Sequence, residues 1–220
     1  MPGGLIEIYS MTEGGVVCLL PCHEFPDKLH TVGRPAPGSE LKVLDDNDNE
    51  VAPGTPGNLV GRSMTMMSGY KNQPDKTREG YWTDPATGET WQRMGDIGRI
   101  DAEGFVELVG RAKDMIISGG FNIYPSDLEA VLEVDARVAE AAVIGMPSRA
   151  WGETPVGFVR LAPGSTEADL SAIMADTNAK LGKTQRLSAL HAIDDMPRSH
   201  IGKLLKTDLR KLAEALDPVA

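Results

Sequence analysis

Short apolar stretches separated by glycine and proline fill the first half of the chain. Residues 35–38 and 53–57 are two such breaks, and punctuation of this kind bounds short strands rather than helices. The predicted strands are Leu5–Tyr9, Leu41–Leu44, Asn58–Val60, Ile97–Ile100 and Phe105–Val109. The acidic stretch 45–49 lacks the glycine and the closing glutamate of a calcium loop, so we interpret it as a solvated turn.

From residue 114 onward the pattern changes to alternating strands and helices. Met115–Ser118 and Phe121–Tyr124 flank a Gly-Gly pair, which predicts a hairpin. A helix is then expected to run to about Val134. Its predicted start is a capping box, in which Ser126 caps the helix and Glu129 reaches back to it.

Two further strands and two further helices complete the second half. The strands are predicted at Val138–Ile144 and Gly157–Leu161, and Thr166 is expected to open the next helix. That helix repeats apolar residues at helical spacing, namely Leu170, Ile173, Met174 and Leu181. The last helix carries a leucine stripe that we interpret as core packing, made of Leu205, Leu209, Leu212 and Leu216.

Charge and composition narrow the possible partners. The 220 residues include 32 acidic and 22 basic side chains, a formal charge of −10, which is unfavourable for binding a polyanion, so no nucleic-acid partner is expected. No apolar run approaches the roughly 18 residues of a membrane span, and the first residues lack a secretory-signal pattern. Two cysteines cannot form a disulfide framework. We therefore expect a cytoplasmic protein without a membrane span.

Four segments of the chain carry residues suited to nucleotide and acyl chemistry. One of them lies at the end of the predicted strand Leu5–Tyr9. Tyr9 offers an aromatic face, Thr12 a hydroxyl and Glu13 a carboxylate. These groups suit an adenine ring, a phosphate and Mg²⁺, because hard cations prefer carboxylate and phosphate oxygens. Taken alone, the segment also fits a strand end followed by a turn.

The second segment pairs Asp96 with Arg111 on neighbouring predicted strands. A carboxylate only accepts hydrogen bonds, so it suits the two hydroxyls of a ribose, while the arginine adds donors. An ion pair on a hairpin is the alternative.

The third and fourth segments lie in the second half. The Ser118-Gly119-Gly120 hairpin is compatible with the wall of a channel for a thin ligand, because glycine permits close backbone approach. Lys203 follows Gly202 in a loop ahead of the last helix, where its ammonium suits charge developing at a carboxylate and a phosphorus centre. The alternative for Lys203 is a solvated surface lysine.

Other candidate sites find less support. Cys18, Cys22 and His23 provide three metal-ligand types, but a single C-x₃-C without a second pair falls short of a zinc pattern. The histidines His30, His191 and His200 have no nucleophile context, so a hydrolase triad is not expected.

In this order and spacing, the four segments resemble the adenylate-forming enzymes, a family of acyl- and aryl-CoA synthetases, peptide-synthetase adenylation domains and luciferases. The most specific stretches are residues 110–125 and 197–206. The resemblance implies that the chain is the C-terminal portion of such an enzyme. It implies an α+β fold in which residues 1–112 form the last β-rich part of a large AMP-binding domain. Residues 114–220 would be the small mobile domain, a three-stranded sheet with helices and a hairpin.

The resemblance also assigns roles by matching position. Tyr9 would stack on adenine, Thr12 would touch the α-phosphate, and Glu13 would ligate Mg²⁺. The ribose would be held by Asp96 and Arg111. The remaining roles are a hinge at Lys113, a catalytic lysine at Lys203, and a CoA channel lined by Ser118, Gly119 and Gly120.

The implied function is a carboxylic acid:CoA ligase (AMP-forming) that uses ATP, Mg²⁺ and CoA on a fatty or aromatic acid. The phosphate loop and the acyl pocket of the family are not in this sequence, so the chain alone is expected to be inactive. Two departures from the family pattern affect the nucleotide region, because Ser10 replaces a usual glycine and Met94 a usual threonine. A non-catalytic interaction or regulatory module is the alternative. We also expect residues 1–112 to need a partner, either a second copy or the missing N-terminal part.

Overall fold

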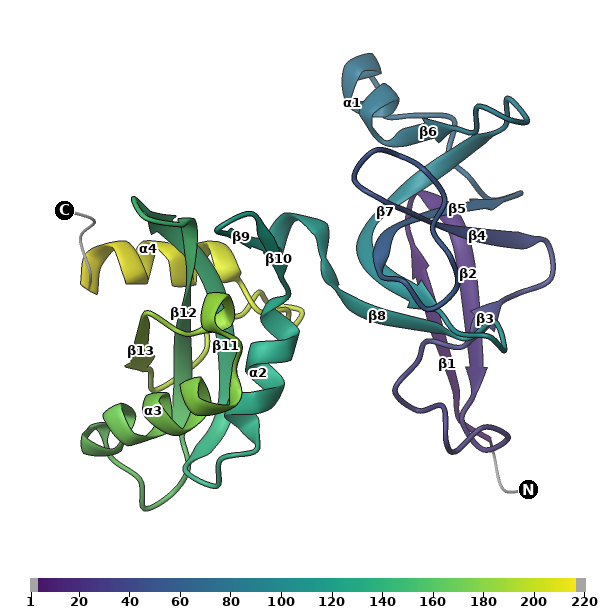
Figure 1. The fold of residues 1–220 in the computed structure, drawn as a ribbon. Coiled ribbons are helices and arrows are strands. Elements are labelled where there is room, and N and C mark those ends of the chain that lie inside the picture. The colour runs from purple at the N-terminus through teal and green to yellow at the C-terminus, as the bar shows by residue number, and fades with distance from the viewer. Residues whose placement is uncertain (1–3, 217–220) are drawn as a thin grey trace. The chain divides into compact units, whose positions relative to one another are not determined.

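The computed structural model describes residues 4–216, and these divide into two compact units between Ala112 and Lys113. Residues 1–3 and 217–220, the outer ends of the two predicted domains, lie outside the described residues. The fold is mixed α and β and rich in strands (Figure 1). Within the described residues, no helix is long and apolar enough to cross a bilayer.

The first unit contains two antiparallel sheets. The smaller has the order β1-β2-β3, and the larger has the order β4-β5-β7-β6 with β8 beside β7. Their bounds are β1 Ile6–Met11, β2 Gly14–Pro21, β3 Arg34–Pro35, β4 Ser39–Leu44, β5 Gly57–Ser63, β6 Tyr81–Thr83, β7 Thr90–Ile100 and β8 Val106–Arg111, with the helix α1 at Pro74–Glu79.

Two apolar clusters hold the first unit together. Strands of both sheets contribute to the larger cluster, whose buried members are Val16, Cys18, Val32, Val43, Leu59, Met94 and Val106. The smaller cluster lies on strands of the five-stranded sheet, with Leu44, Val60, Trp82 and Trp91. Strand β1 pairs with β2 alone in the three-stranded sheet, and its Ile6 and Ile8 are exposed.

The second unit is one five-stranded sheet with helices on both faces. The strand order is β10-β9-β12-β11, and β13 runs parallel to β12. The bounds are β9 Ile116–Ser118, β10 Phe121–Ile123, β11 Val138–Ser148, β12 Gly152–Leu161 and β13 Ala189–Ala192. The helices are α2 Pro125–Glu133, α3 Leu170–Lys180 and α4 Lys206–Leu216.

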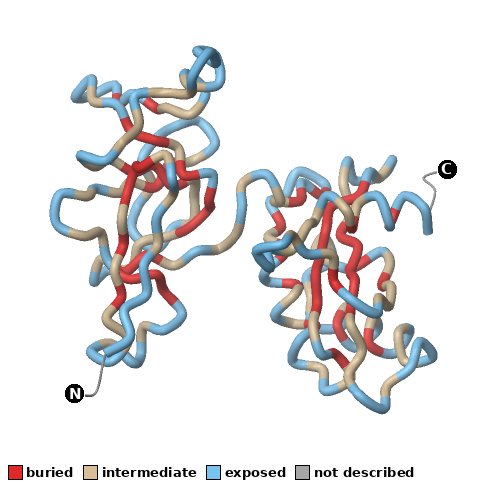
Figure 2. The backbone as a smooth tube through the Cα atoms, turned by 180° about the vertical axis from the view of Figure 1, so that it is seen from behind, coloured by how far each residue is buried: buried red, intermediate tan, exposed pale blue. Residues whose placement is uncertain are grey.

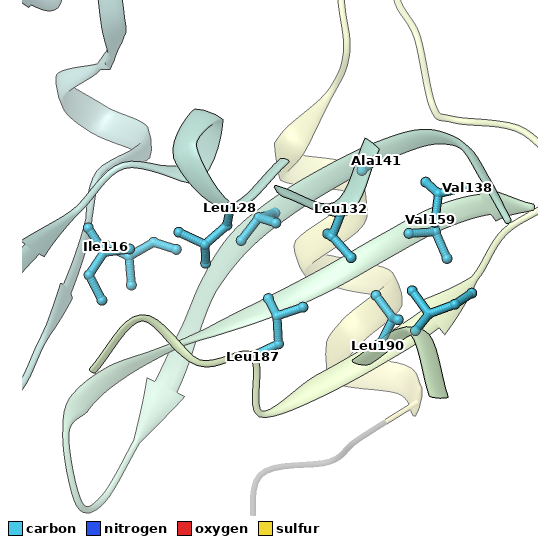
Figure 3. Packing of buried hydrophobic residues seen from close by; sticks show 11 residues of the cluster. Ile116, Leu128, Leu132, Val138, Ala141, Val159, Leu187 and Leu190 are labelled. Carbon is cyan, nitrogen blue, oxygen red and sulfur yellow. The ribbon is translucent and has the colours of Figure 1, made fainter. Parts of the chain in front are cut away.

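Alternation along β11 gives this sheet its two cores. Val143 packs with Leu128 and Leu132 of α2 and with Ile173 of α3, whereas Ile144 belongs to the cluster that contains α4. Successive strand residues point to opposite faces, so one strand serves both cores. Figure 2 shows buried backbone running through the centre of this unit. Figure 3 shows side chains of the first core, contributed by α2 and the sheet.

Every strand predicted in the first half coincides with an observed strand, but several elements were missed. Strands β2, β3, β6 and β13, helix α1 and the first part of β7 were not predicted. The β2 segment is apolar without strict alternation because it is largely buried, so the period-two signal is weak there. The acidic stretch forms a turn in which Asp45 Oδ1 accepts hydrogen bonds from the Asn47 and Asn49 amides, each at 2.8 Å.

In the second half, the predicted capping box was wrong, and the predicted leucine stripe was wrong in part. The N-cap of α2 is Tyr124 with Pro125 following it, and Glu129 binds Val143 and Lys206 rather than the helix start. In α4, Leu209 is buried but Leu212 and Leu216 are exposed. The buried residues of α4 are Leu209 and Ala213, four residues apart, so its buried face follows the i, i+4 positions and leaves out Leu212 and Leu216.

Candidate functional site

Three residues far apart in the sequence meet in the first unit. The Tyr9 hydroxyl donates a 2.7 Å hydrogen bond to Asp96 Oδ2, and Arg111 Nε lies 2.9 Å from Asp96 Oδ1. They come from β1, β7 and β8 respectively. All three side chains predicted to hold the adenine and ribose therefore form one cluster.

Backbone geometry explains where Asp96 lies. It is paired directly with Arg111 across the β7–β8 ladder. On its other side, the β5–β7 register shifts next to it, and Gly95 has a φ of 71°. Such a bulge turns a side chain out of the regular alternation, and the positive φ favours glycine.

The cluster combines a buried carboxylate with an accessible cation. Asp96 is buried, whereas 55% of the Arg111 side chain is exposed. Burial, and then the hydrogen bond to the Asp96 carboxylate, raise the pKa of the Tyr9 hydroxyl far above its ordinary value. Tyr9 is therefore a neutral donor. Each Asp96 oxygen has a second lone pair, so the carboxylate can accept further bonds from hydroxyl groups.

Glu13 is held by the loop that follows β5. The Tyr70 hydroxyl donates to Glu13 Oε1 at 2.8 Å, and the Met67 amide donates to the Glu13 carbonyl at 2.9 Å. The hydrogen bond to Glu13 raises the pKa of Tyr70. Tyr70 is not among the site residues that the sequence predicts, because it lies 57 positions from Glu13.

The surroundings of Glu13 fit a magnesium ion shared with a phosphate. Tyr70 binds one of its two carboxylate oxygens. In the part of the chain that the structure describes, no three His, Cys, Asp or Glu side chains are grouped to bind a metal by themselves. Mg²⁺ is usually bound through one or two carboxylates together with substrate phosphates. Thr12, beside Glu13, is exposed in the turn between β1 and β2.

The two departures from the family pattern lie in different environments. Ser10 is exposed on β1. Met94 is buried in the larger apolar cluster, and a Cβ on Gly15 would come within 2.7 Å of its sulfur. The Met94 side chain therefore fills space in the core of the first unit.

The glycine hairpin of the second unit packs tightly against Trp151. The Gly119 amide donates to the Trp151 carbonyl at 2.8 Å, and a Cβ on Gly119 would lie 2.8 Å from the Trp151 ring. Gly119 and Gly120 are exposed, but Ser118 is buried. Of the three residues predicted to line the channel, the two glycines are therefore the accessible ones.

Lys203 is exposed in a loop of residues 197–205 before α4, called here the lysine loop. Its amide donates to Ser199 Oγ at 3.2 Å, and its carbonyl accepts from the Ser199 amide at 2.8 Å. Its backbone is fixed while its side chain faces solvent. Lys113 is also exposed, within the short helical turn Ala112–Asp114, and is the first residue of the second unit.

The cysteine motif begins beside the site, because Cys18 is paired with Tyr9 across the β1–β2 ladder. Cys18 is fully buried in the larger apolar cluster, and burial raises its pKa to about 12. Cys22 donates to the Leu20 carbonyl, and both thiols are free.

Two families match the sequence in separate regions. Residues 1–71 match the AMP-binding enzyme family, and residues 127–203 match the AMP-binding enzyme C-terminal domain. The first match contains Tyr9, Thr12 and Glu13, and the second ends at Lys203.

Individual relatives match nearly all of this chain. A long-chain-fatty-acid–CoA ligase of Escherichia coli O157:H7 is 36% identical over 209 residues, which are 94% of this chain and 35% of the relative. A 2-succinylbenzoate–CoA ligase of Bacillus cereus is 35% identical over 212 residues, 96% of this chain and 42% of the relative. The crystal structure of ATP-bound MatB from Rhodopseudomonas palustris matches with a TM-score of 0.83 and 29% identity, covering 96% of this chain and 41% of that one. The chain thus spans about two fifths or less of the first two relatives.

Proposed function

Because this chain belongs to the AMP-binding, adenylate-forming enzymes, we propose that it forms the C-terminal part of a carboxylic acid:CoA ligase (AMP-forming). In the first step, a carboxylate oxygen attacks the α-phosphorus of ATP, and pyrophosphate leaves. In the second step, the CoA thiol attacks the acyl carbonyl and AMP leaves. The proposed acid is fatty or aromatic, in line with the names of the two ligases above.

The observation that carries this proposal is the cluster of Tyr9, Asp96 and Arg111. A buried carboxylate flanked by a phenol and a half-exposed guanidinium suits a ribose beside an aromatic base. In this assignment the Asp96 carboxylate accepts the ribose hydroxyls and Arg111 donates to them, since a carboxylate itself has no donor. The ring of Tyr9 stacks on the adenine.

The turn after β1 is assigned to the phosphates. Thr12 donates to the α-phosphate, and Glu13 would hold Mg²⁺, with Tyr70 orienting the carboxylate. The bound ion would neutralise phosphate charge as pyrophosphate leaves.

Lys203 is assigned to the first step. Its ammonium stabilises the negative charge that develops between the acyl carboxylate and the α-phosphate, which is the charge that distinguishes the transition state from bound ATP. Rotation about Lys113 then brings the Gly119-Gly120 hairpin to the pantetheine of CoA for the second step. One small domain would thus serve both half-reactions.

A chimaera tests the proposal directly. This chain replaces the matching 209 residues of the E. coli O157:H7 ligase, and the two half-reactions are measured separately, as ATP–pyrophosphate exchange and as CoA transfer from supplied acyl-AMP. We expect Lys203→Ala to lower exchange by roughly 10²- to 10³-fold, the loss typical of one transition-state donor, and to spare CoA transfer. The control is Lys211→Met, which removes an exposed lysine of α4.

Either of two results would contradict the proposal. One is a folded chimaera without pyrophosphate exchange, the result expected of a non-catalytic interaction or regulatory module. The other is an equal loss of both half-reactions in Lys203→Ala.

A further inference from the structure

The lysine loop is closed at its base by its own backbone. The Leu205 amide donates to the Pro197 carbonyl at 2.8 Å, and the Gly202 amide donates to the Ser199 carbonyl at 2.8 Å. An antiparallel bridge joins Arg198 to Leu204. These bonds define the shape of the loop but do not attach it to the sheet.

One attachment comes before Lys203. Arg198 Nη1 donates to the Gly202 carbonyl at 2.9 Å, and its Nη2 binds the Glu140 carboxylate of β11. A guanidinium presents several donors in a fixed plane, so it can hold the loop and the strand at the same time.

A second attachment comes three residues after Lys203. Lys206 Nζ lies 2.8 Å from Glu129 Oε1 and 3.1 Å from the Val143 carbonyl oxygen. Glu129 Oε1 also accepts the Val143 amide at 2.8 Å. The Lys206 and Glu129 side chains are 17% and 22% exposed. The three residues form a closed ring that joins the start of α4 to α2 and β11.

The ring forms because β11 lies at the edge of the sheet and has backbone groups that no neighbouring strand binds. Strand β11 ends the strand order, and Val143 is paired with Gly157 of β12 on one side only. Glu129 and Lys206 bind the amide and carbonyl of Val143, and Glu133 accepts the amide of Ala141 at 3.2 Å. Glu129 and Glu133 are one helical turn apart on α2, and their two amide partners are two residues apart on the strand. The helix thereby covers backbone groups that an edge strand would otherwise leave unpaired.

We propose that Glu129 and Lys206 are positioning residues for Lys203. They fix the end of the lysine loop against β11, so that the Lys203 side chain starts from a defined backbone position. The inference rests on the role proposed above for Lys203. A three-residue connection spans at most about 10 Å, so the ring restrains Lys203 from the side opposite the Arg198 attachment, and its loss would leave Lys203 attached on one side alone. Misplacing a reacting group by about 1 Å can cost roughly 100-fold in rate.

Hydrogen exchange of the 220-residue chain tests the attachment itself. We expect the Gly202 and Lys203 amides to exchange at least tenfold faster in Glu129→Gln and in Lys206→Met than in the unmodified chain. Lys206→Arg should restore protection, because arginine retains the charge and the donors. Lys211→Met, on the same helix in an exposed pair with Asp208, should leave these two amides unchanged.

A double variant separates positioning from stability. Lys206→Met leaves Glu129 without its cation, and a partly buried unpaired charge is itself destabilising. Glu129→Gln combined with Lys206→Met removes that charge, so the melting temperature should recover while the lysine loop stays fast-exchanging. Unchanged exchange of Gly202 and Lys203 in the folded double variant would overturn the inference.

Assays of the chimaera test whether the ring of Glu129, Lys206 and Val143 affects the reaction. The double variant should lower pyrophosphate exchange at least tenfold and spare CoA transfer from supplied acyl-AMP, whereas general damage to the second unit would lower both. Equal losses would also overturn the positioning role. If Lys203→Ala leaves pyrophosphate exchange unchanged while the double variant still mobilises the loop, the proposed function fails and the attachment stands.

Discussion

Tyr9 and Asp96 are 87 residues apart and are joined by a 2.7 Å hydrogen bond in which the phenol donates. Arg111 binds the other oxygen of the same carboxylate. The bond therefore links the end of strand β1 to the bulge in β7, and it places an aromatic ring beside a buried acceptor. The nucleoside site proposed for the first unit depends on this pairing.

The ionisation of Tyr9 should report this pairing. Burial and the neighbouring carboxylate both raise its pKa, so the Tyr9 ring resonance should remain unchanged at about pH 11, where an ordinary tyrosine has passed its pKa of about 10. Asp96→Asn removes the negative charge and should move the pKa of Tyr9 back toward that value. Titration of Tyr9 in the unmodified chain near pH 10, followed by ring carbon NMR, would contradict the observed pairing.

Lys113→Pro should separate the two half-reactions of the chimaera. Proline fixes φ near about −65° and removes the backbone donor, so rotation at this position is restricted. We expect one half-reaction to be retained and the other to stall, whereas Lys113→Ala should retain both. Single-turnover measurements of acyl-AMP formation and of CoA transfer test this expectation. Unchanged steady-state turnover in the proline variant would show that the hinge lies elsewhere.

The two thiols should differ in reactivity. Cys18 is fully buried, and its raised pKa of about 12 keeps it protonated near neutral pH; the thiolate is the reactive form. Cys22 is partly exposed. A disulfide reagent at about pH 8 should therefore label one thiol quickly in the native chain and both in denaturant. Fast labelling of both native thiols would contradict the packing of the larger apolar cluster.

The stability of the second unit should depend on pH through Asp135. Hydrogen bonds from the Arg137 side chain and backbone lower the pKa of Asp135 to about 2, below its ordinary value of 3.8. The resulting stabilisation is present above about pH 4 and is lost as the pH falls toward 2. Asp135→Asn should therefore lower the urea midpoint at neutral pH, and this difference should shrink in acid. A difference that is independent of pH would show that the charge of Asp135 does not contribute.

The sequence predicted the strands bounded by glycine and proline, and it missed those defined by long-range contacts. Strand β13, for example, forms because it runs beside β12, a pairing that no local pattern encodes. The capping-box prediction at Glu129 failed for a related reason. A carboxylate three residues into a helix can reach back to the cap, but here the open edge of β11 offers it a partner in a different element.

Only part of the candidate site could be predicted from the sequence, because contacts between distant residues form only in the fold. The residue types in the Tyr9 segment and the Asp96 segment indicate nucleotide chemistry, but only the fold brings Tyr9 to Asp96. Tyr70 could not be ranked from sequence, because its role depends on a contact with Glu13 across 57 positions. The sequence singles out Lys203 through the preceding glycine and the resemblance, but it assigns no role to Lys206, and only the structure shows that Lys206 is attached to Glu129.

The most direct test of the central claim is an NMR titration of the 220-residue chain with AMP. We expect saturable shifts at the amides of Tyr9, Asp96 and Arg111, with a dissociation constant on the order of 1 mM, equivalent to about 4 kcal/mol. Asp96→Asn should abolish these shifts. The matched control Asp101→Asn, which changes an aspartate paired with Lys28 in the same unit, should retain them. Absence of saturable shifts at the three residues in the folded chain would contradict the assignment of a nucleoside site to this cluster.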